Sequence, residues 1–120
     1  MARKRTQSTK QRLGDCYEAS GRYVLDHCLQ HQHLRLVHGE VAGRGELEGI
    51  RFGHAWVLDG DEVIDVSNGR EVRLPKVVYY AIGGIDHIGN FRAYTCKQAL
   101  QRITKHGTWG PWDIETSTGL

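Results

Sequence analysis

One β-hairpin constrains the fold of this chain more than any other stretch, because its register can be written down from the sequence. Asp59-Gly60 favours a two-residue type I′ turn, and residues 53–65 on either side of it are rich in β-favouring side chains. With that dipeptide as the loop, His54 lies opposite Asp65, with their Cβ atoms about 4.5–5.5 Å apart. The sequence therefore predicts an imidazole oriented by a carboxylate, which is the arrangement of a general base that activates a nucleophile.

A cysteine that could be this nucleophile begins the first predicted helix. Asp15 followed by Glu18 has the spacing of a capping box, and apolar residues then recur at helical spacing, which predicts a helix over about 16–31. Cys16 is its first residue. Unpaired backbone N–H groups and the positive end of the helix dipole favour a thiolate at that position.

Cys16, His54 and Asp65 are therefore the candidate catalytic residues. Each has a simple structural explanation when taken alone: an inert buried thiol, a strand histidine and a strand-end carboxylate. Together they supply a nucleophile, a base and a group that orients the base.

Thr95 with Gln98 makes another capping-box signature, which predicts a second helix from Cys96 to about His106. Cys96 is therefore the rival nucleophile, but no paired histidine and carboxylate lie near it in the sequence.

A cysteine at a helix start (Cys16-Tyr-Glu-Ala19), a strand reading His54-Ala-Trp-Val57 and an aspartate, Asp65, on the next strand form a recognisable pattern. Over residues 13–67 it resembles the transglutaminase-like branch of the papain-like cysteine proteases, most closely the leader peptidases of lasso-peptide biosynthesis. The resemblance implies a Cys-His-Asp triad that attacks a peptide or glutamine carbonyl through a thioester. It also implies an oxyanion donor just upstream of the cysteine, for which Gln11 is the candidate.

The remaining elements predict an α+β fold. The N-terminal helix carrying the cysteine packs on an antiparallel sheet of four or five strands, and a second helix lies near the C-terminus. Beyond the hairpin, strands are predicted over residues 34–41, 71–74, 76–82 and 91–94, with a loop at 86–90. Tyr79 and Tyr80, as neighbours on a strand, would point to opposite faces.

Basic residues are concentrated at the N-terminus. Residues 1–12 hold five of the sixteen Lys and Arg residues and no acid, so the rest of the chain has eleven basic and fourteen acidic residues. We predict a flexible basic tail over 1–12, a single transglutaminase-like domain over 13–116 and a loose C-terminus over 117–120. The tail could contact a polyanion weakly, or it could simply be solvated.

The cysteine count and the hydropathy pattern predict a cytoplasmic protein. Three cysteines at irregular spacing do not suggest a disulfide framework, and no apolar run is long enough to span a membrane. The basic start has no apolar segment behind it, unlike a secretory signal. His27 and His31 are four residues apart, but no second pair completes a metal site, so we expect neither a metal nor another cofactor.

Two tryptophans, Trp109 and Trp112, flank Gly110-Pro111 near the C-terminus. This segment is either a latch on an apolar patch or an aromatic wall for a substrate or partner groove. Trp56, beside His54, is a third candidate substrate contact. The predicted function is a small cysteine peptidase with a peptide or protein substrate. The alternatives are a transglutaminase or deamidase of the same fold and a non-enzymatic binding module.

Overall fold

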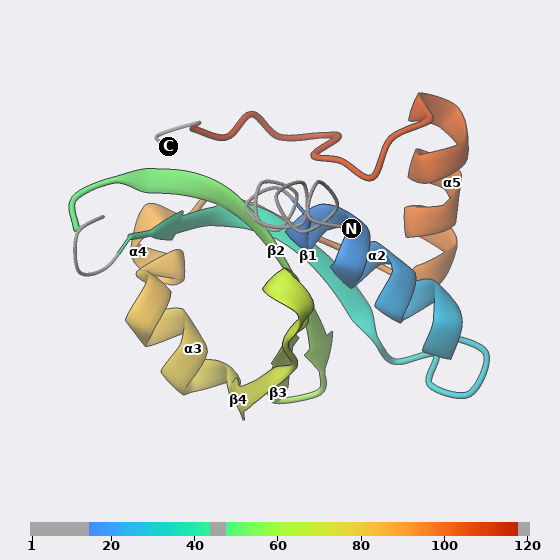
Figure 1. The fold of residues 1–120 in the computed structure, drawn as a ribbon, viewed down its shortest axis with the longest axis horizontal. Coiled ribbons are helices and arrows are strands. Elements are labelled where there is room, and N and C mark those ends of the chain that lie inside the picture. Colours follow the sequence, from blue (N-terminus) through green and yellow to red (C-terminus); the bar gives the residue numbers. More distant parts are fainter. Residues whose placement is uncertain (1–14, 44–47, 118–120) are drawn as a thin grey trace, which may run out of the picture.

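An open antiparallel sheet forms the centre of the computed structural model, which describes residues 15–43 and 48–117 (Figure 1). The five strands lie in the order β4-β3-β2-β1-β5. They are β1 (Arg35–Ala42), β2 (Arg51–Asp59), β3 (Glu62–Asp65), β4 (Val72–Pro75) and β5 (Phe91–Tyr94). The helices are α2 (Cys16–His27), α3 (Lys76–Gly83), α4 (Ile85–Ile88) and α5 (Cys96–His106), with a 3-10 turn, η2 (Ser67–Gly69). The predicted α+β class, with the first helix carrying Cys16, is confirmed.

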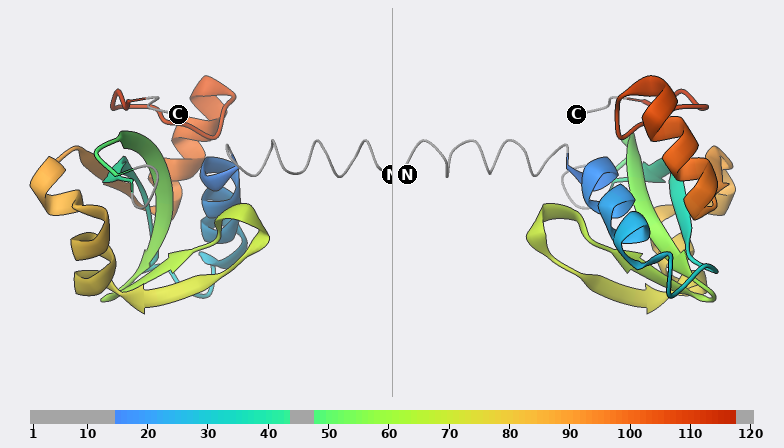
Figure 2. Two further views of the ribbon diagram at one scale, coloured as in Figure 1. Left: turned by 60° about the vertical axis from the view of Figure 1, so that its left-hand side comes forward. Right: turned by 90° about the vertical axis from the view of Figure 1, so that its right-hand side faces the viewer.

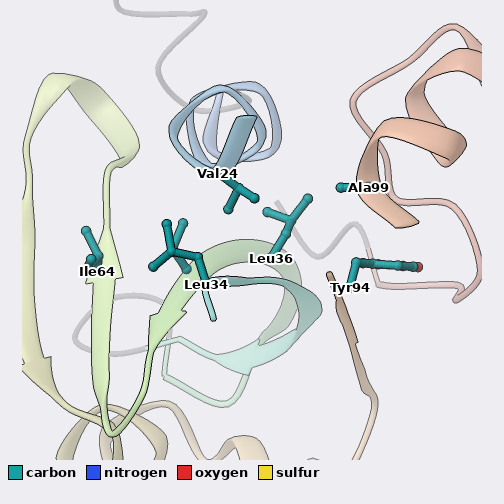
Figure 3. Packing of buried hydrophobic residues seen from close by; sticks show 7 residues of the cluster. Val24, Leu34, Leu36, Ile64, Tyr94 and Ala99 are labelled. Carbon is teal, nitrogen blue, oxygen red and sulfur yellow. The ribbon is translucent and has the colours of Figure 1, made fainter. Parts of the chain in front are cut away.

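Different helices cover the two faces of the sheet (Figures 1 and 2). On one face, Val24 of α2 and Ala99 of α5 lie against Leu36 and its neighbours in the sheet (Figure 3). This core cluster comprises Val24, Leu34, Leu36, Val57, Ile64, Tyr94 and Ala99. On the other face, α3 and α4 contribute Tyr80 and Ile85 to a second cluster around Trp56. His54, two residues before Trp56 on β2, shares this second face because strand side chains alternate.

The turn between β2 and β3 lies one residue later than predicted. Asp59 pairs with Glu62, so the two-residue loop begins at Gly60, whose φ is +63°. The prediction that His54 lies directly opposite Asp65 is therefore wrong, since the strand pairing is displaced by two residues. A displacement by an even number keeps every side chain on its original face, so the two residues still share one.

Residues 76–82, predicted as a strand, form helix α3 instead. Pro75 ends β4 immediately before the helix, and Gly84 closes it in the left-handed conformation. The β-branched and aromatic residues of this segment favour a strand locally, but packing of Tyr80 against the sheet selects the helix. The predicted loop over 86–90 is also partly helical, because α4 continues through it to Ile88.

Cys28 and Cys96 form a disulfide that joins the end of α2 to the start of α5. The odd number and irregular spacing of the cysteines suggest no disulfide framework, and the structure has this single disulfide. The two residues are 68 apart in sequence, and only the packing of α2 beside α5 brings them together. All three cysteines lie within the described residues, and Cys16 is the one that remains free.

The two predicted capping boxes have different outcomes. At α5, Thr95 and Gln98 form the reciprocal hydrogen bonds of a capping box. At α2, the side chain of Asp15 makes no capping hydrogen bond, because its backbone is near-helical (φ −92°, ψ −1°) rather than extended. The helix nevertheless begins at the predicted residue and ends at His27, earlier than expected.

None of the helices in the described part of the chain is long and apolar enough to cross a lipid bilayer. The basic tail predicted over 1–12, with Gln11 in it, lies outside the described residues. The same is true of the last three residues of the predicted loose C-terminus.

Candidate active site

His54 and Asp65 are in hydrogen-bond contact, with 2.9 Å between His54 Nε2 and Asp65 Oδ2. Pairing between β2 and β3 ends at Val57 and Ile64, so the two strands are no longer paired where these residues lie. The histidine therefore reaches the aspartate diagonally rather than from directly across the ladder. The pair that the hairpin pattern predicts is present, although in a different register.

The Asp65 carboxylate is held by further donors besides the histidine. Ser67 donates to Oδ1 through its backbone N–H at 3.1 Å and its hydroxyl at 2.8 Å, and Tyr79 donates to Oδ2 at 2.6 Å. Burial raises the pKa of Asp65, but the hydrogen bond and charge of His54 and the other donors outweigh it, leaving the pKa well below its usual range. Asp65 is therefore an anion fixed from several sides.

Cys16 contacts the same imidazole from the start of α2. Its side chain is hydrogen-bonded to His54 and only 6% of the residue is exposed. Helix α2 contacts both β2 and η2, which puts its first residue beside the point where β2 and β3 separate. Because Nε2 of His54 faces Asp65, Nδ1 is the ring nitrogen left for the thiol. The three predicted residues thus form one chain of hydrogen bonds.

His54 is held in its charged form by its two partners. Burial lowers the pKa of His54, but the hydrogen bonds and charges of Asp65 and Cys16 outweigh it and raise this pKa to about 10. Only 17% of the His54 side chain is exposed, so solvent screens these charges weakly. At neutral pH the site therefore contains an imidazolium between a carboxylate and a cysteine sulfur.

Tyr79, like Ser67, belongs to this site but was not predicted from the sequence. A strand would turn Tyr79 and Tyr80 to opposite faces, but on a helix consecutive side chains differ by about 100°. Both therefore reach the same side: Tyr79 binds Asp65, and Tyr80 accepts a 3.3 Å hydrogen bond from Trp56. Burial and the charge of Asp65 raise the pKa of Tyr79, so it remains a neutral donor. The signal for it was Pro75 before the segment and two glycines after it, which are typical of helix ends.

Trp56 is not placed to touch a substrate. Its side chain is fully buried in the core between the sheet and α3, and its indole N–H donates to Tyr80. This candidate substrate contact is thus a core residue.

The C-terminal tryptophans hold the end of the chain against the molecule, as the latch interpretation expects. Trp109 lies against Gly21 of α2, and Trp112 packs on His38 with ring centroids 4.6 Å apart. Trp112 also packs edge-on against Tyr94 at 5.2 Å. Both rings pack on the α2 and α5 side of the sheet, away from the face that His54 occupies.

The segment after Trp112 reaches the chain neighbours of the candidate catalytic residues. Ser117 accepts a 3.1 Å hydrogen bond from the backbone N–H of Gly53, beside His54, and its own N–H donates to Glu40 at 2.8 Å. Thr116 lies where a side chain at Gly53 would be, and so does the hydroxyl of Tyr17. A glycine is therefore required at position 53 for the chain end to lie there.

His38 on β1 has a lowered pKa, whereas the pKa of His54 is raised. It is fully buried among Tyr17, Tyr94 and Trp112, and neither ring nitrogen has a hydrogen-bond partner in the described structure. Burial, opposed weakly by the charge of Asp113, lowers the pKa of His38 to about 4. It is therefore a neutral core residue at physiological pH.

No metal site accompanies these residues. Within residues 15–43 and 48–117, no group of three or more His, Cys, Asp or Glu side chains could hold a metal ion. His31 lies beyond the end of α2 at His27, so these two histidines do not share a helical face.

Compared with known proteins, the chain matches no family model, no curated protein and no solved structure. Its function is therefore inferred from the side chains gathered where α2, β2 and β3 meet.

Proposed function

We propose that this protein is a cysteine-dependent amide hydrolase, a small peptidase of the transglutaminase-like kind. The observation that supports it is the hydrogen-bonded chain from Cys16 through His54 to Asp65. A thiol, an imidazolium and a fixed carboxylate in this order are the parts of a nucleophilic cysteine site. The arrangement of a cysteine helix against a hairpin that carries the histidine and aspartate agrees with the resemblance in the sequence.

In the first half of the proposed reaction, the sulfur of Cys16 attacks the carbonyl carbon of the substrate. The imidazolium of His54 balances the negative charge of the sulfur before attack and then gives its proton to the departing amine. Asp65 keeps the ring in one orientation and stabilises its positive charge. The product of this half is a thioester on Cys16 and a free amine.

Water completes the reaction. Neutral His54 removes a proton from water as it attacks the thioester, and the proton returns to the Cys16 sulfur as the acid leaves. The first α-helical bond of α2 runs from Ala19 N–H to Asp15 C=O, so the N–H of Cys16 has no partner within the helix and can donate to the oxyanion. Gln11 is proposed as a second donor on the resemblance alone.

The Cys28–Cys96 disulfide favours an oxidising compartment over the predicted cytoplasm, because disulfides are characteristic of oxidising compartments.

Alkylation of the unreduced protein with iodoacetamide tests the nucleophile. An ordinary thiol, with a pKa of about 8.5, is almost fully protonated at pH 6 and reacts slowly there. We expect Cys16 to be carboxamidomethylated readily at pH 6 and this reactivity to be lost in His54→Ala. His33→Ala is the matched control, because His33 pairs with Asp59 on the surface rather than with a cysteine. Unchanged Cys16 alkylation in His54→Ala would exclude His54 as the activating base.

Acyl transfer is the second test. With a p-nitrophenyl ester, we expect a burst of nitrophenol of about one equivalent per protein and an acyl mass on Cys16. A reactive Cys16 that accepts no acyl group from esters or peptides would instead indicate a binding module built on this scaffold.

A further inference from the structure

An apolar pocket of about 210 Å³ opens beside the ring of His54, on the face of the sheet that α3 covers. It is lined by Val41, Ala42, Phe52, His54, Leu74, Tyr79, Ile82 and Gly83. The ring of Phe52 meets that of His54 edge-on, with their centroids 6.4 Å apart. The pocket therefore shares His54 with the proposed catalytic chain, and it also includes Tyr79, which binds Asp65 of that chain.

The polar groups of these shared residues are already occupied. The hydroxyl of Tyr79 and Nε2 of His54 both bind Asp65, and the remaining lining side chains are aliphatic or aromatic. A polar or charged group that entered the pocket would lose its hydration without gaining a partner. The pocket therefore suits a hydrocarbon side chain.

Its size agrees with one such side chain. An apolar protein cavity of about 150 Å³ is known to bind benzene, so this pocket has room for a branched aliphatic chain or a phenyl ring. Ile82 lies at the rim with 44% of its surface exposed, so the pocket can be reached from solvent. A larger hollow of about 710 Å³ between α3 and α4, around Lys76 and Asp86, includes none of the three proposed catalytic residues.

We propose that this pocket binds an apolar side chain of the substrate next to the amide bond that Cys16 attacks, and so selects leucine-like or aromatic residues there. This inference rests on the proposed function, because it needs Cys16 and His54 to form the reacting centre. Burial of the side chain against the His54 ring would hold the neighbouring carbonyl near the sulfur. Alignment of this kind raises the rate of attack as well as affinity.

A panel of N-acetyl aminoacyl chloromethyl ketones with Gly, Leu, Phe or Asp side chains tests the pocket on the native protein. In each reagent the Cys16 sulfur displaces chloride and forms a carbon–sulfur bond, and mass spectrometry gives the rate. We expect the Leu and Phe reagents to label Cys16 about 10- to 100-fold faster than the Gly reagent. The Asp reagent is expected to be the slowest.

A substitution at the rim links this preference to the pocket. Ile82→Asp introduces a charge into the wall, and we expect its Leu-to-Gly rate ratio to fall to within about twofold of one. Leu100→Asp is the matched control, because Leu100 on α5 is also exposed, at 52%, and lies far from the pocket lining. It should keep the native ratio. Circular dichroism verifies the fold of both variants. If Ile82→Asp does not fold, the reagent panel on the native protein still tests the pocket.

The outcomes separate this inference from the proposed function. Equal Cys16 labelling by all four reagents, or a native Leu-to-Gly ratio in folded Ile82→Asp, would refute the pocket and leave the nucleophile intact. If no reagent labels Cys16, the proposed function itself fails, and the pocket inference fails with it.

Discussion

Tyr79 donates a 2.6 Å hydrogen bond to Asp65 Oδ2, the same oxygen that lies 2.9 Å from His54 Nε2. The tyrosine comes from α3 and the aspartate from the end of β3, so this contact ties the helix to the proposed site. We predict that Tyr79→Phe lowers the free energy of unfolding by about 1.5–3 kcal/mol at pH 7, the usual worth of a hydrogen bond to a charged group. Urea denaturation measures this change.

The loss in Tyr79→Phe should depend on pH. The pKa of Asp65 is lower in the folded protein than its ordinary value, so its contribution to stability is present above about pH 4 and is lost as the pH falls. The difference in the free energy of unfolding between the native protein and Tyr79→Phe should therefore become smaller below pH 4. Tyr23→Phe is the control, because the hydroxyl of Tyr23 accepts a hydrogen bond from Arg73 at the surface. We expect its free energy of unfolding to change by no more than about 0.5 kcal/mol. Equal losses in both variants would contradict a specific role for Tyr79.

Asp65→Asn keeps the shape of the side chain and removes its charge. The negative charge that raises the pKa of His54 is then absent, so we predict that kcat/KM for ester hydrolysis falls by about 10²–10⁴-fold. Asp59→Asn provides a close comparison, because Asp59 also pairs with a histidine, His33, but in solvent. Activity close to native in Asp65→Asn would show that the carboxylate has no part in the reaction.

His54 and His38 should titrate at opposite ends of the pH scale. Their pKa values of about 10 and about 4 predict that the ring protons of His54 shift in alkali and those of His38 in acid. Since the folded pKa of His54 is the raised one, its stabilising contribution is complete below about pH 6.5 and is lost as the pH rises towards 10. NMR titration, with each signal assigned from a His→Gln variant, measures both. A His54 midpoint near 6.5 would contradict the charged pair.

Trp112→Ala should expose His38. We predict a loss of about 3 kcal/mol in the free energy of unfolding, the lower end of the range for tryptophan truncation because this ring is only half-buried. Water then reaches the imidazole, so the pKa of His38 should rise from about 4 towards its ordinary value of about 6.5. Trp112→Phe, which keeps a ring in contact, should lose less stability and keep the low pKa. Denaturation measures the loss of stability, and NMR titration measures the pKa of His38. Equal stability losses and equal His38 pKa values in Trp112→Ala and Trp112→Phe would contradict the prediction.

Much of the fold could be predicted from local signals. The start of α2 at Cys16, the capping box of α5 and the strand over 91–94 each depend on a few neighbouring residues, and all are present. Residues 76–82 could not be assigned in this way, because their side chains favour a strand and only contact with the sheet makes them helical. The Cys28–Cys96 disulfide likewise follows from helix packing, which leaves no trace in cysteine spacing.

The proposed site shows a similar division. The shared face of His54 and Asp65 could be predicted because the alternation of strand side chains tolerates a two-residue error in register. Their exact opposition could not, since turn position depends on which of Asp59 and Gly60 begins the loop. Tyr79 could not be predicted because its segment has the local character of a strand. Trp56 is a candidate substrate contact in the sequence, and its burial in the core depends on tertiary packing that the sequence does not show.

His38 and His54 lie on adjacent paired strands but face opposite sides of the sheet. Acid charges the buried imidazole beneath the tryptophan latch, whereas alkali discharges the one that ties the hairpin to α2. The first loosening of the structure is therefore expected at the C-terminal segment when the pH falls, and at the junction of α2 and β3 when it rises. One sheet thus separates the side of the protein that weakens first in acid from the side that weakens first in alkali.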